Sequence, residues 1–409
     1  MEGAIHHCTA EIHQRVSIFP SMKHWTWCLI IFAGMSCREE EPAATGPTAP
    51  LPVAKSNPLP VLAHVMPWFE TLQHDGAWGH HWTMANAQPW TTGADGLPDV
   101  ASHYHPLIGP YSSFDEDVLE YHTLLMKYSG IDGAIIDWYG TSGVLDYGRI
   151  DEATEALIAA LRRAGLEYAL MYEDRTLANV PAGQAALDWA HIAGRHFTDT
   201  AYFRVEGEPW VGVFGPIELE TPEEWAAVGV SGRTFAIWGE GAEMGAVGEF
   251  AWIWGGEGVD HLAAVAAFSE GPGARTGVAY PGFKDFYVNG GWGAGLGWEI
   301  AHNQGQTLLD LLEIASNADL DALQLATWND FGEGTMIEPT HEFGFSPLES
   351  VQGFTGVAYG LPELELIHEL YLARKAHAGD PEAQTLLDEA FRLLVRLDPD
   401  AARAQLAAL

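Results

Sequence analysis

Positive charge is scarce in this sequence. The 409 residues include 19 lysines and arginines against 56 aspartates and glutamates, a formal net charge of −37, and only five of the 19 are lysine. A nucleic-acid-binding protein needs a basic face that displaces counterions from phosphates. A protein that docks directly on an anionic membrane needs one too. The charge therefore excludes nucleic acid as a partner and leaves a membrane only through a lipid anchor.

Cysteine is also scarce, and it is confined to one end. The three cysteines are Cys8, Cys28 and Cys37. The rest of the chain can therefore form neither a disulfide nor a thiolate metal site. With 47% hydrophobic residues, the sequence is too apolar for a disordered acidic chain. Its 16 tryptophans fit two interpretations, as core residues or as stacking surfaces for a flat ligand such as a sugar ring.

The first 60 residues differ from the rest. Met22-Lys23 precedes an apolar run, 25–35, that is too short to span a bilayer, and Ser36-Cys37 follows. This pattern resembles a bacterial lipoprotein signal, so we expect residues 1–37 to be an export leader. Cys37 would be the lipidated residue and Met22 the true start. An ordinary signal peptide without lipid is the alternative. The Pro- and Ala-rich residues 38–60 are typical of a tether. These features predict a cell-envelope lipoprotein or a secreted protein.

From residue 60 onward, short apolar runs alternate with helical stretches. This alternation predicts parallel strands joined by crossover helices, and eight units predict an α/β fold, a (β/α)8 TIM barrel, over 61–360. A doubly wound open sheet is the alternative, but it would need a glycine-rich phosphate turn after its first strand, where Pro67-Trp68-Phe69 stands. The eight predicted strands are Val61–Met66, Ala134–Trp138, Tyr168–Tyr172, Trp210–Phe214, Phe235–Trp238, Phe250–Trp254, Gly277–Tyr280 and Ala322–Thr327.

Helix signals punctuate the runs. Helical spacing of apolar residues predicts helices over 115–129 and 151–164, each ended by a glycine. Thr221 to Glu224 has the order of a capping box with proline at the first helical position. Residues 361–409 predict two or three amphipathic helices, interrupted at Gly379-Asp380-Pro381. We expect the first to be the last helix of the barrel and the others to form a short C-terminal extension.

The residues that follow the predicted strands are carboxylates and aromatics. In a barrel these strand ends carry the reacting groups. Asp137 and Trp138 end the second strand, Tyr139 follows it, and Glu173 follows the third strand. Few arginines or lysines accompany them, which disfavours a phosphorylated or carboxylated substrate. Carboxylates beside aromatic platforms are what cleavage of a glycosidic bond requires.

The strongest local signal is the pair Asp330 and Glu333 after the eighth strand. Gly332 and Gly334 permit a tight turn, so both carboxylates can face one cavity. Two close carboxylates also push their proton affinities apart, which suits one acid and one base. The alternative is a pair of solvated loop acids.

These segments resemble two known families. Trp328–Glu333 is similar to the end of strand eight in glycoside hydrolase family 71, and its continuation to Pro339 resembles glycoside hydrolase family 99. Further stretches resembling family 99 are Pro67–Phe69, His103–Ser112, Gly130–Gly133 and Asp137–Gly140. The resemblance spans roughly residues 60–345.

The resemblance implies a (β/α)8 barrel that cleaves an α-linked polysaccharide from within. Family 99 acts on α-mannosides with retention, through the sugar's own 2-hydroxyl, and family 71 acts on α-1,3-glucan with inversion. In both, the residue matching Glu333 is the proton donor and the one matching Asp330 is the base. Asp330 stands where family 99 has Glu, and Phe331 and Gly332 replace Trp and His. The shorter carboxylate leaves room for a water, as inversion requires.

We expect a neutral polysaccharide or oligosaccharide as substrate, with no cofactor and no metal. One alternative is a surface glycan-binding lipoprotein without catalysis. Another is a metal-dependent hydrolase using His80, His81, His103 and His105, which would still lack a placed carboxylate. The residues expected to contact substrate, some of them only through the resemblance, are Trp68, His103, His105, Tyr111, Asp137, Trp138, Tyr139, Glu173, Tyr280, Trp328, Asn329 and Glu338. Core packing is the alternative for Trp138 and Tyr139, pairing with Arg175 for Glu173, and bracing of the loop for Glu338.

Overall fold

Eight parallel strands close into a barrel in the computed structural model, which describes residues 49–409. Each strand pairs with the next along the chain, and β9 pairs with β1 to complete the ring. β4, Arg204–Val205, lies outside the ring as an antiparallel partner of β5. The strands of the ring are β1 Val61–Val65, β2 Gly133–Trp138, β3 Glu167–Tyr172, β5 Glu208–Val213, β6 Arg233–Ile237, β7 Gly248–Phe250, β8 Ala274–Ala279 and β9 Ala322–Leu325.

The barrel confirms the predicted fold class. All eight predicted runs overlap a strand of the ring, although β7 ends at Phe250, where the predicted run begins. The shift arises because the apolar residues over 250–254 follow the paired backbone of β7 and do not coincide with it. Trp252, on the segment that follows, lines the cavity described below.

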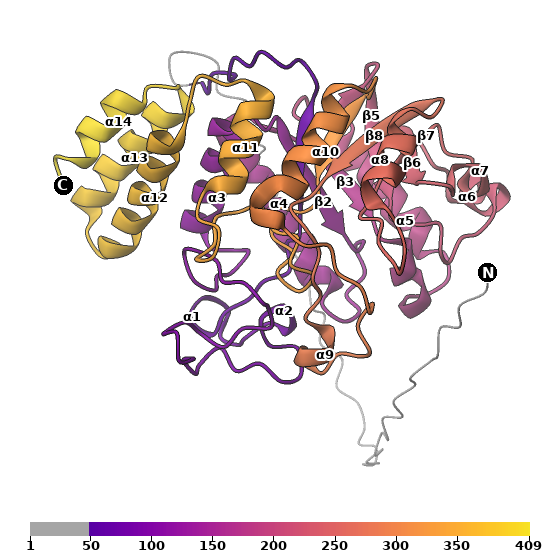
Figure 1. Cartoon of the computed structure of the whole chain (residues 1–409), viewed down its shortest axis with the longest axis horizontal. Helices are drawn as coiled ribbons and strands as arrows, with labels where there is room; N and C mark the ends of the chain where they lie inside the picture. The colour runs from indigo at the N-terminus through magenta and orange to yellow at the C-terminus, as the bar shows by residue number, and fades with distance from the viewer. Residues whose placement is uncertain (1–48) are drawn as a thin grey trace, which may run out of the picture. The chain divides into compact units, whose positions relative to one another are not determined.

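Helices surround the barrel and cover its strands (Figure 1). Burial on both faces explains why the strands have continuous apolar runs. The capping box at α6 is present, with Thr221 accepting from the Glu224 amide. The helices after the strands are α3 Glu116–Tyr128, α4 Tyr147–Ala164, α5 Gln184–His191 with the π-helix η2 Ile192–His196, α6 Pro222–Val228, α7 Gly241–Met244, α8 His261–Ser269, α10 Gln306–Ser316 and α11 Ser346–Thr355.

Short helices lie in the loops after the strands. The long connections after β1 and β8 gather at one end of the barrel with α1, α2 and α9, at the lower side of Figure 1. This is the end where the strands point, so these loops build the rim of the site. The short helices are α1 Leu72–Asp75, α2 His80–Thr83, η1 Asp174–Asn179, α9 Tyr287–Gly290 and η3 Asn303–Gly305.

Three helices follow the barrel: α12 Leu361–Ala376, α13 Pro381–Val395 and α14 Pro399–Leu406. They stand beside α3 in Figure 1. α11 contacts α10, and its last residue, Thr355, donates to the carbonyl of Ser129 just after α3. That the first helix after residue 361 is the last helix of the barrel stays a prediction. α12 packs on α3 through a buried ion pair, with Arg374 Nη2 3.0 Å from Glu120 Oε2.

Residues 49–60 run along the opposite end of the barrel. The Leu51 amide donates to Val395 (3.0 Å), the Asn57 amide donates to Thr355 (3.1 Å), and Lys55 pairs with Asp132 just before β2. This part of the expected tether is thus held against the barrel. The predicted leader 1–37, with Cys37, lies outside the described residues. Among the helices of 49–409, none combines the length and the apolar character needed to cross a bilayer.

Candidate active site

A cavity of about 430 Å³ opens at the carboxyl ends of the strands. Its size is ordinary for a small-molecule or sugar site. A second hollow of about 360 Å³ lies between α8 and α10 on the outside of the barrel, away from the strand ends. The first cavity holds six of the predicted site residues: Trp68, Asp137, Tyr139, Glu173, Asp330 and Glu333. It is also lined by His64, Met66, Phe69, His81, Met84, Arg175, Phe214, Trp252, Tyr287, Trp292 and Gly332.

Asp330 and Glu333 share a tight turn after β9. Asp330 Oδ1 accepts the Glu333 amide at 3.0 Å, and the Asp330 amide donates to Thr327 Oγ1 at 2.7 Å. Gly334 has φ 66°, a left-handed conformation that glycine adopts freely. The backbone of the turn thus holds the carboxylate of Asp330 in place. The other accepts a hydrogen bond from the Tyr287 hydroxyl, 2.7 Å from Glu333 Oε1.

Four carboxyl groups share this cavity, and all four bind protons more tightly than usual. Burial, with the charge of Glu333, raises the pKa of Asp330 well above its ordinary value. Burial also raises the pKa of Glu333, against the hydrogen bond from Tyr287, which lowers it. Burial raises the pKa of Asp137 strongly and brings that of Glu173 to about 7. The group can therefore hold and exchange protons near neutral pH.

Arg175 is the one arginine or lysine that lines this cavity. Its Nε lies 3.2 Å from Glu173 Oε2, and its side chain is 61% exposed. Its charge lowers the pKa of Asp137, Glu173 and Glu333 against the larger effect of burial. Asp137 Oδ1 is buried without a hydrogen-bond partner. One exposed arginine cannot neutralise four carboxyl groups, so the cavity suits a neutral ligand rich in hydroxyl groups.

Aromatic rings form one wall of the cavity. Trp68 stacks on His81 with ring centroids 4.0 Å apart and planes 7° apart. Burial, with the neighbouring His80, lowers the pKa of His81 to about 3, so this ring is neutral. Trp292 is 48% exposed at the rim and meets Tyr287 edge to face at 5.8 Å. Such rings can stack against the apolar face of a sugar.

Four predicted site residues lie behind the cavity rather than in it: Tyr111, Trp328, Asn329 and Glu338. Asn329 accepts from the Met66 amide (2.8 Å) and donates to the Met66 carbonyl (3.0 Å), so it joins the ends of β9 and β1. Tyr111 donates to Glu338 at 2.6 Å, and His122 lies 2.8 Å from the other oxygen of that carboxylate. The network supports the turn that carries the carboxylates, and none of these four residues lines the cavity.

Four more predicted contacts point elsewhere. Trp138 is fully buried on the helix side of β2, where it donates to Asp151, because successive strand residues face opposite sides. Tyr280 contacts His261 at 3.1 Å. His103 contacts the carbonyl of Asp285 at 3.1 Å, and His105 bonds Glu342 at 3.0 Å. With His80 and His81, these histidines form no converging set of metal ligands within residues 49–409.

Sequence reasoning missed several residues that line the cavity. Tyr287 and Trp292 come from the glycine-rich loop after β8, which has no periodicity that would predict an inward direction. His64 points inward from β1, where it bonds Gln324 (3.3 Å) and burial lowers its pKa to about 4. The spacing of two residues from Leu62 and from Met66 could have predicted that His64 points inward.

Comparison with known proteins identifies the fold. No protein-family model matches the sequence, and no curated protein matches it significantly. Two solved structures of the GH99 endo-alpha-mannosidase from Bacteroides thetaiotaomicron are similar. The first has 17% identity and a TM-score of 0.55 and covers 72% of this chain and 97% of that one. The second, in complex with bis-tris-propane, has 16% identity and a TM-score of 0.56 and covers 75% and 98%.

The chain has the fold of the GH99 barrel. A third solved structure, named a glycoside hydrolase-like protein, agrees, with 14% identity, a TM-score of 0.55, and coverage of 76% of this chain and 98% of that one. At these sequence identities, the structural similarity supports the fold, namely the barrel and its helices. The chemistry has to be argued from the cavity itself.

Proposed function

We propose that the protein is a glycoside hydrolase that cleaves an α-linked polysaccharide or oligosaccharide from within. The observation that carries the proposal is the turn that places Asp330 and Glu333 in one cavity with raised pKa values. The GH99 neighbours support it, since their names describe enzymes that cut α-mannosides internally. An α-mannan or an α-1,3-glucan is the substrate to test first.

Glu333 is the proposed general acid. Its pKa is raised by burial, so it can hold a proton at neutral pH and deliver it to the departing glycosidic oxygen. Tyr287 donates to Oε1, which directs the carboxyl group within the cavity. The second oxygen is then the one available to carry the proton.

Asp330 is the proposed general base: two backbone hydrogen bonds favour its ionised form, although burial and the charge of Glu333 raise its pKa overall, so it serves as the base when Glu333 holds the proton. It would act either on a water or on the sugar's 2-hydroxyl. The short side chain favours the water and thus inversion. Asp137 and Glu173 are proposed to bind substrate hydroxyls, and Trp68 and Tyr139 to pack against the ring.

The test is the release of reducing ends from yeast α-mannan and α-1,3-glucan by the purified protein. Glu333→Gln and Asp330→Asn should each lower kcat about 10²- to 10⁴-fold. Glu313→Gln, on the exposed face of α10 and away from the cavity, is the matched control. Proton NMR of the first-formed anomer distinguishes inversion from retention. Full activity in both variants would contradict the assignment. Glycan binding without turnover, unchanged in Glu333→Gln, would instead favour the non-catalytic glycan-binding alternative.

We further propose that the protein is exported and anchored through a lipid on Cys37. The charged residue, the short apolar run and the small residue before this cysteine support the proposal. The acidic body is repelled by an anionic membrane surface, so lipid would be the only attachment.

A further inference from the structure

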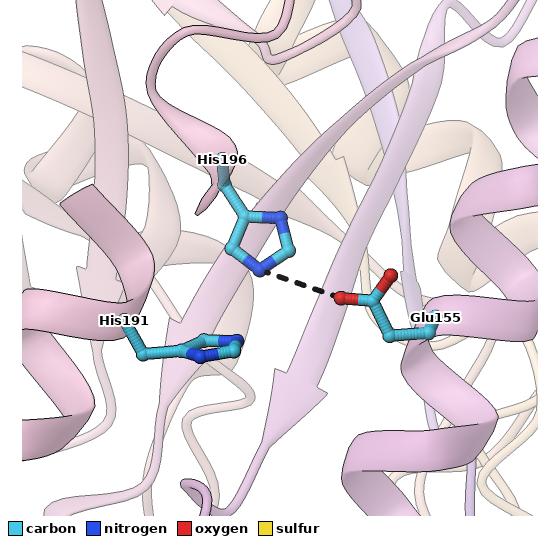
Figure 2. A group of neighbouring side chains, drawn as sticks. All are labelled: Glu155, His191 and His196. Carbon is cyan, nitrogen blue, oxygen red and sulfur yellow. Dashed lines mark ion pairs between the residues drawn. The ribbon is translucent and has the colours of Figure 1, made fainter. Parts of the chain in front are cut away.

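Glu155, His191 and His196 converge on the outer wall of the barrel (Figure 2). One ligand atom from each lies within 4.8 Å of the others, and His196 Nε2 is 3.8 Å from Glu155 Oε1. Glu155 comes from α4, His191 ends α5, and His196 ends η2. Within residues 49–409, this is the one group of three or more His, Cys, Asp and Glu side chains that converges so closely.

The local backbone explains how two histidines five positions apart reach one point. In an α-helix, residues five apart point about 140° away from each other. Here α5 continues into the π-helix η2, Ile192–His196. The wider turn of a π-helix, with its i→i+5 bonds, brings such residues to nearly the same face, and π-turns occur often at functional sites.

The histidines present free nitrogens to this point. His191 Nε2 is buried and has no hydrogen-bond partner, and its ring stacks on Trp138 at 5.9 Å. His196 Nδ1 lies 3.1 Å from the Tyr168 hydroxyl, which itself donates to Asp199 at 2.8 Å. Because that hydroxyl proton is used by Asp199, His196 Nδ1 must be the donor to Tyr168. The lone pair of His196 is therefore on Nε2, facing Glu155.

We propose that Glu155, His191 and His196 bind a divalent transition-metal ion, with zinc as the best fit. Two imidazoles and one carboxylate are a common zinc set, completed by water. Tetrahedral bonds of about 2.0–2.1 Å place ligand atoms about 3.4 Å apart, so only small side-chain movements are required.

Arg195 shares the carboxylate and has to be accommodated. Its Nε and Nη2 lie 2.5 Å from the two oxygens of Glu155. A carboxylate offers about four acceptor positions, so Oε1 can bind the arginine and a metal at once. The arginine orients the carboxylate as an outer-shell partner. Glu155 is a quarter exposed, which leaves a path from solvent.

The metal would join α4 to η2 and act on stability rather than on the reaction. None of the three ligands lines the catalytic cavity. Trp138 lies between, because it stacks on His191 while its neighbour Asp137 faces inward. Activity and metal binding can therefore be tested separately.

The test is titration of the full-length, metal-free protein with Co²⁺ and Zn²⁺, followed by visible spectroscopy and calorimetry. We expect one equivalent of Co²⁺ with the intense bands of a low-coordinate nitrogen and oxygen site, displaced by Zn²⁺. The variants His191→Ala and Glu155→Gln should each no longer bind this equivalent of Co²⁺. Tyr168→Phe should weaken it about 10- to 100-fold, as expected for an outer-shell partner.

The matched control is His74→Ala, since His74 also lies 3.3 Å from a carboxylate oxygen, that of Asp75, without a second histidine. It should retain the full equivalent. Binding that persists in both His191→Ala and Glu155→Gln, or a cobalt–thiolate band from the N-terminal cysteines in its place, would overturn the proposal. So would the absence of any bound Co²⁺. If His191→Ala does not fold, Glu155→Gln decides, because it keeps the size of the side chain and one oxygen that can accept from Arg195.

Discussion

The hydroxyl of Tyr287 donates a hydrogen bond to the carboxyl group of Glu333, 2.7 Å away. This contact joins the loop after β8 to the turn after β9, so two separate chain segments set the state of one acid. It lowers the pKa of Glu333 against the rise caused by burial. The tyrosine therefore tunes the acid as well as directing it.

Tyr287→Phe should raise the pKa of Glu333 further, because the stabilising donor to its ionised form is lost. If Glu333 is the general acid, its protonated form then persists to higher pH. The alkaline limb of the kcat/KM profile should move to higher pH, with about a tenfold loss at the optimum. The measurement is a pH–rate profile beside that of Tyr359→Phe, a tyrosine outside the cavity. An unmoved limb would argue against Glu333 as the acid.

Glu173→Gln should stabilise the protein in alkaline solution. Burial raises the pKa of Glu173 from 4.5 to about 7. The contribution of Glu173 to folding stability is thus complete below its pKa in the unfolded chain. It is lost as the pH rises through about 7, its pKa in the folded protein. Glutamine mimics the protonated form, so the gain should be about 1–3 kcal/mol near pH 8 and close to zero near pH 4.5. Thermal unfolding at both pH values measures it, with Glu313→Gln as the exposed control.

Arg374→Met should destabilise the whole barrel rather than the C-terminal helices alone. The change leaves Glu120, whose side chain is 6% exposed, without its main partner. Breaking such a pair costs about 3–5 kcal/mol, and the second change Glu120→Leu should restore much of it. Urea unfolding should show one transition in each variant. A separate early transition would mean that α12–α14 unfold independently.

Trp292→Ala should weaken substrate binding while leaving chemistry largely intact. The ring is half-exposed at the cavity rim, where it can cover a sugar. Its loss should raise KM about 5- to 30-fold with little change in kcat. Trp90→Ala is the control, since Trp90 is 63% exposed and does not line the cavity. Equal effects of both changes would remove Trp292 from the binding surface.

Cys37→Ser should release the protein from the membrane fraction of a host that processes lipoproteins. Without a thiol at this position no lipid can be added, and the folded body offers no basic surface in compensation. Fractionation and mass spectrometry of the mature N-terminus measure the outcome. A variant that stays with the membrane would contradict the proposed anchor.

Strand ends were the predictable part of the site. Asp137, Glu173, Asp330 and Glu333 follow buried runs, and the closure of a barrel necessarily gathers such positions at one end. The direction of a single side chain was not predictable, because it depends on the register that closure imposes. Asp137 thus faces the cavity, whereas Trp138 beside it faces the helices and packs on His191.

The positions of loop residues and of supporting side chains could not be predicted from the sequence, for a different reason. Tyr287 lies in a four-residue helix whose position depends on tertiary packing, with no repeating pattern to reveal it. The resemblance over His103–Ser112 and over the strand-eight motif predicted Tyr111, Asn329 and Glu338 as ligand contacts, with a role in bracing the loop as the alternative for Glu338. In the structure they hold the turn from behind. A motif records which residues a site needs, without distinguishing those that touch a ligand from those that support it.

The course of residues 49–60 has a consequence for how the molecule meets a long polymer. The segment lies against Thr355, Val395 and Asp132, at the end of the barrel opposite the loops that carry α1, α2 and α9 (Figure 1). The proposed anchor on Cys37 would therefore join the folded body at the end of the barrel away from the cavity mouth. A polysaccharide, the proposed substrate, could then lie across the mouth without meeting the point where residue 49 joins the barrel.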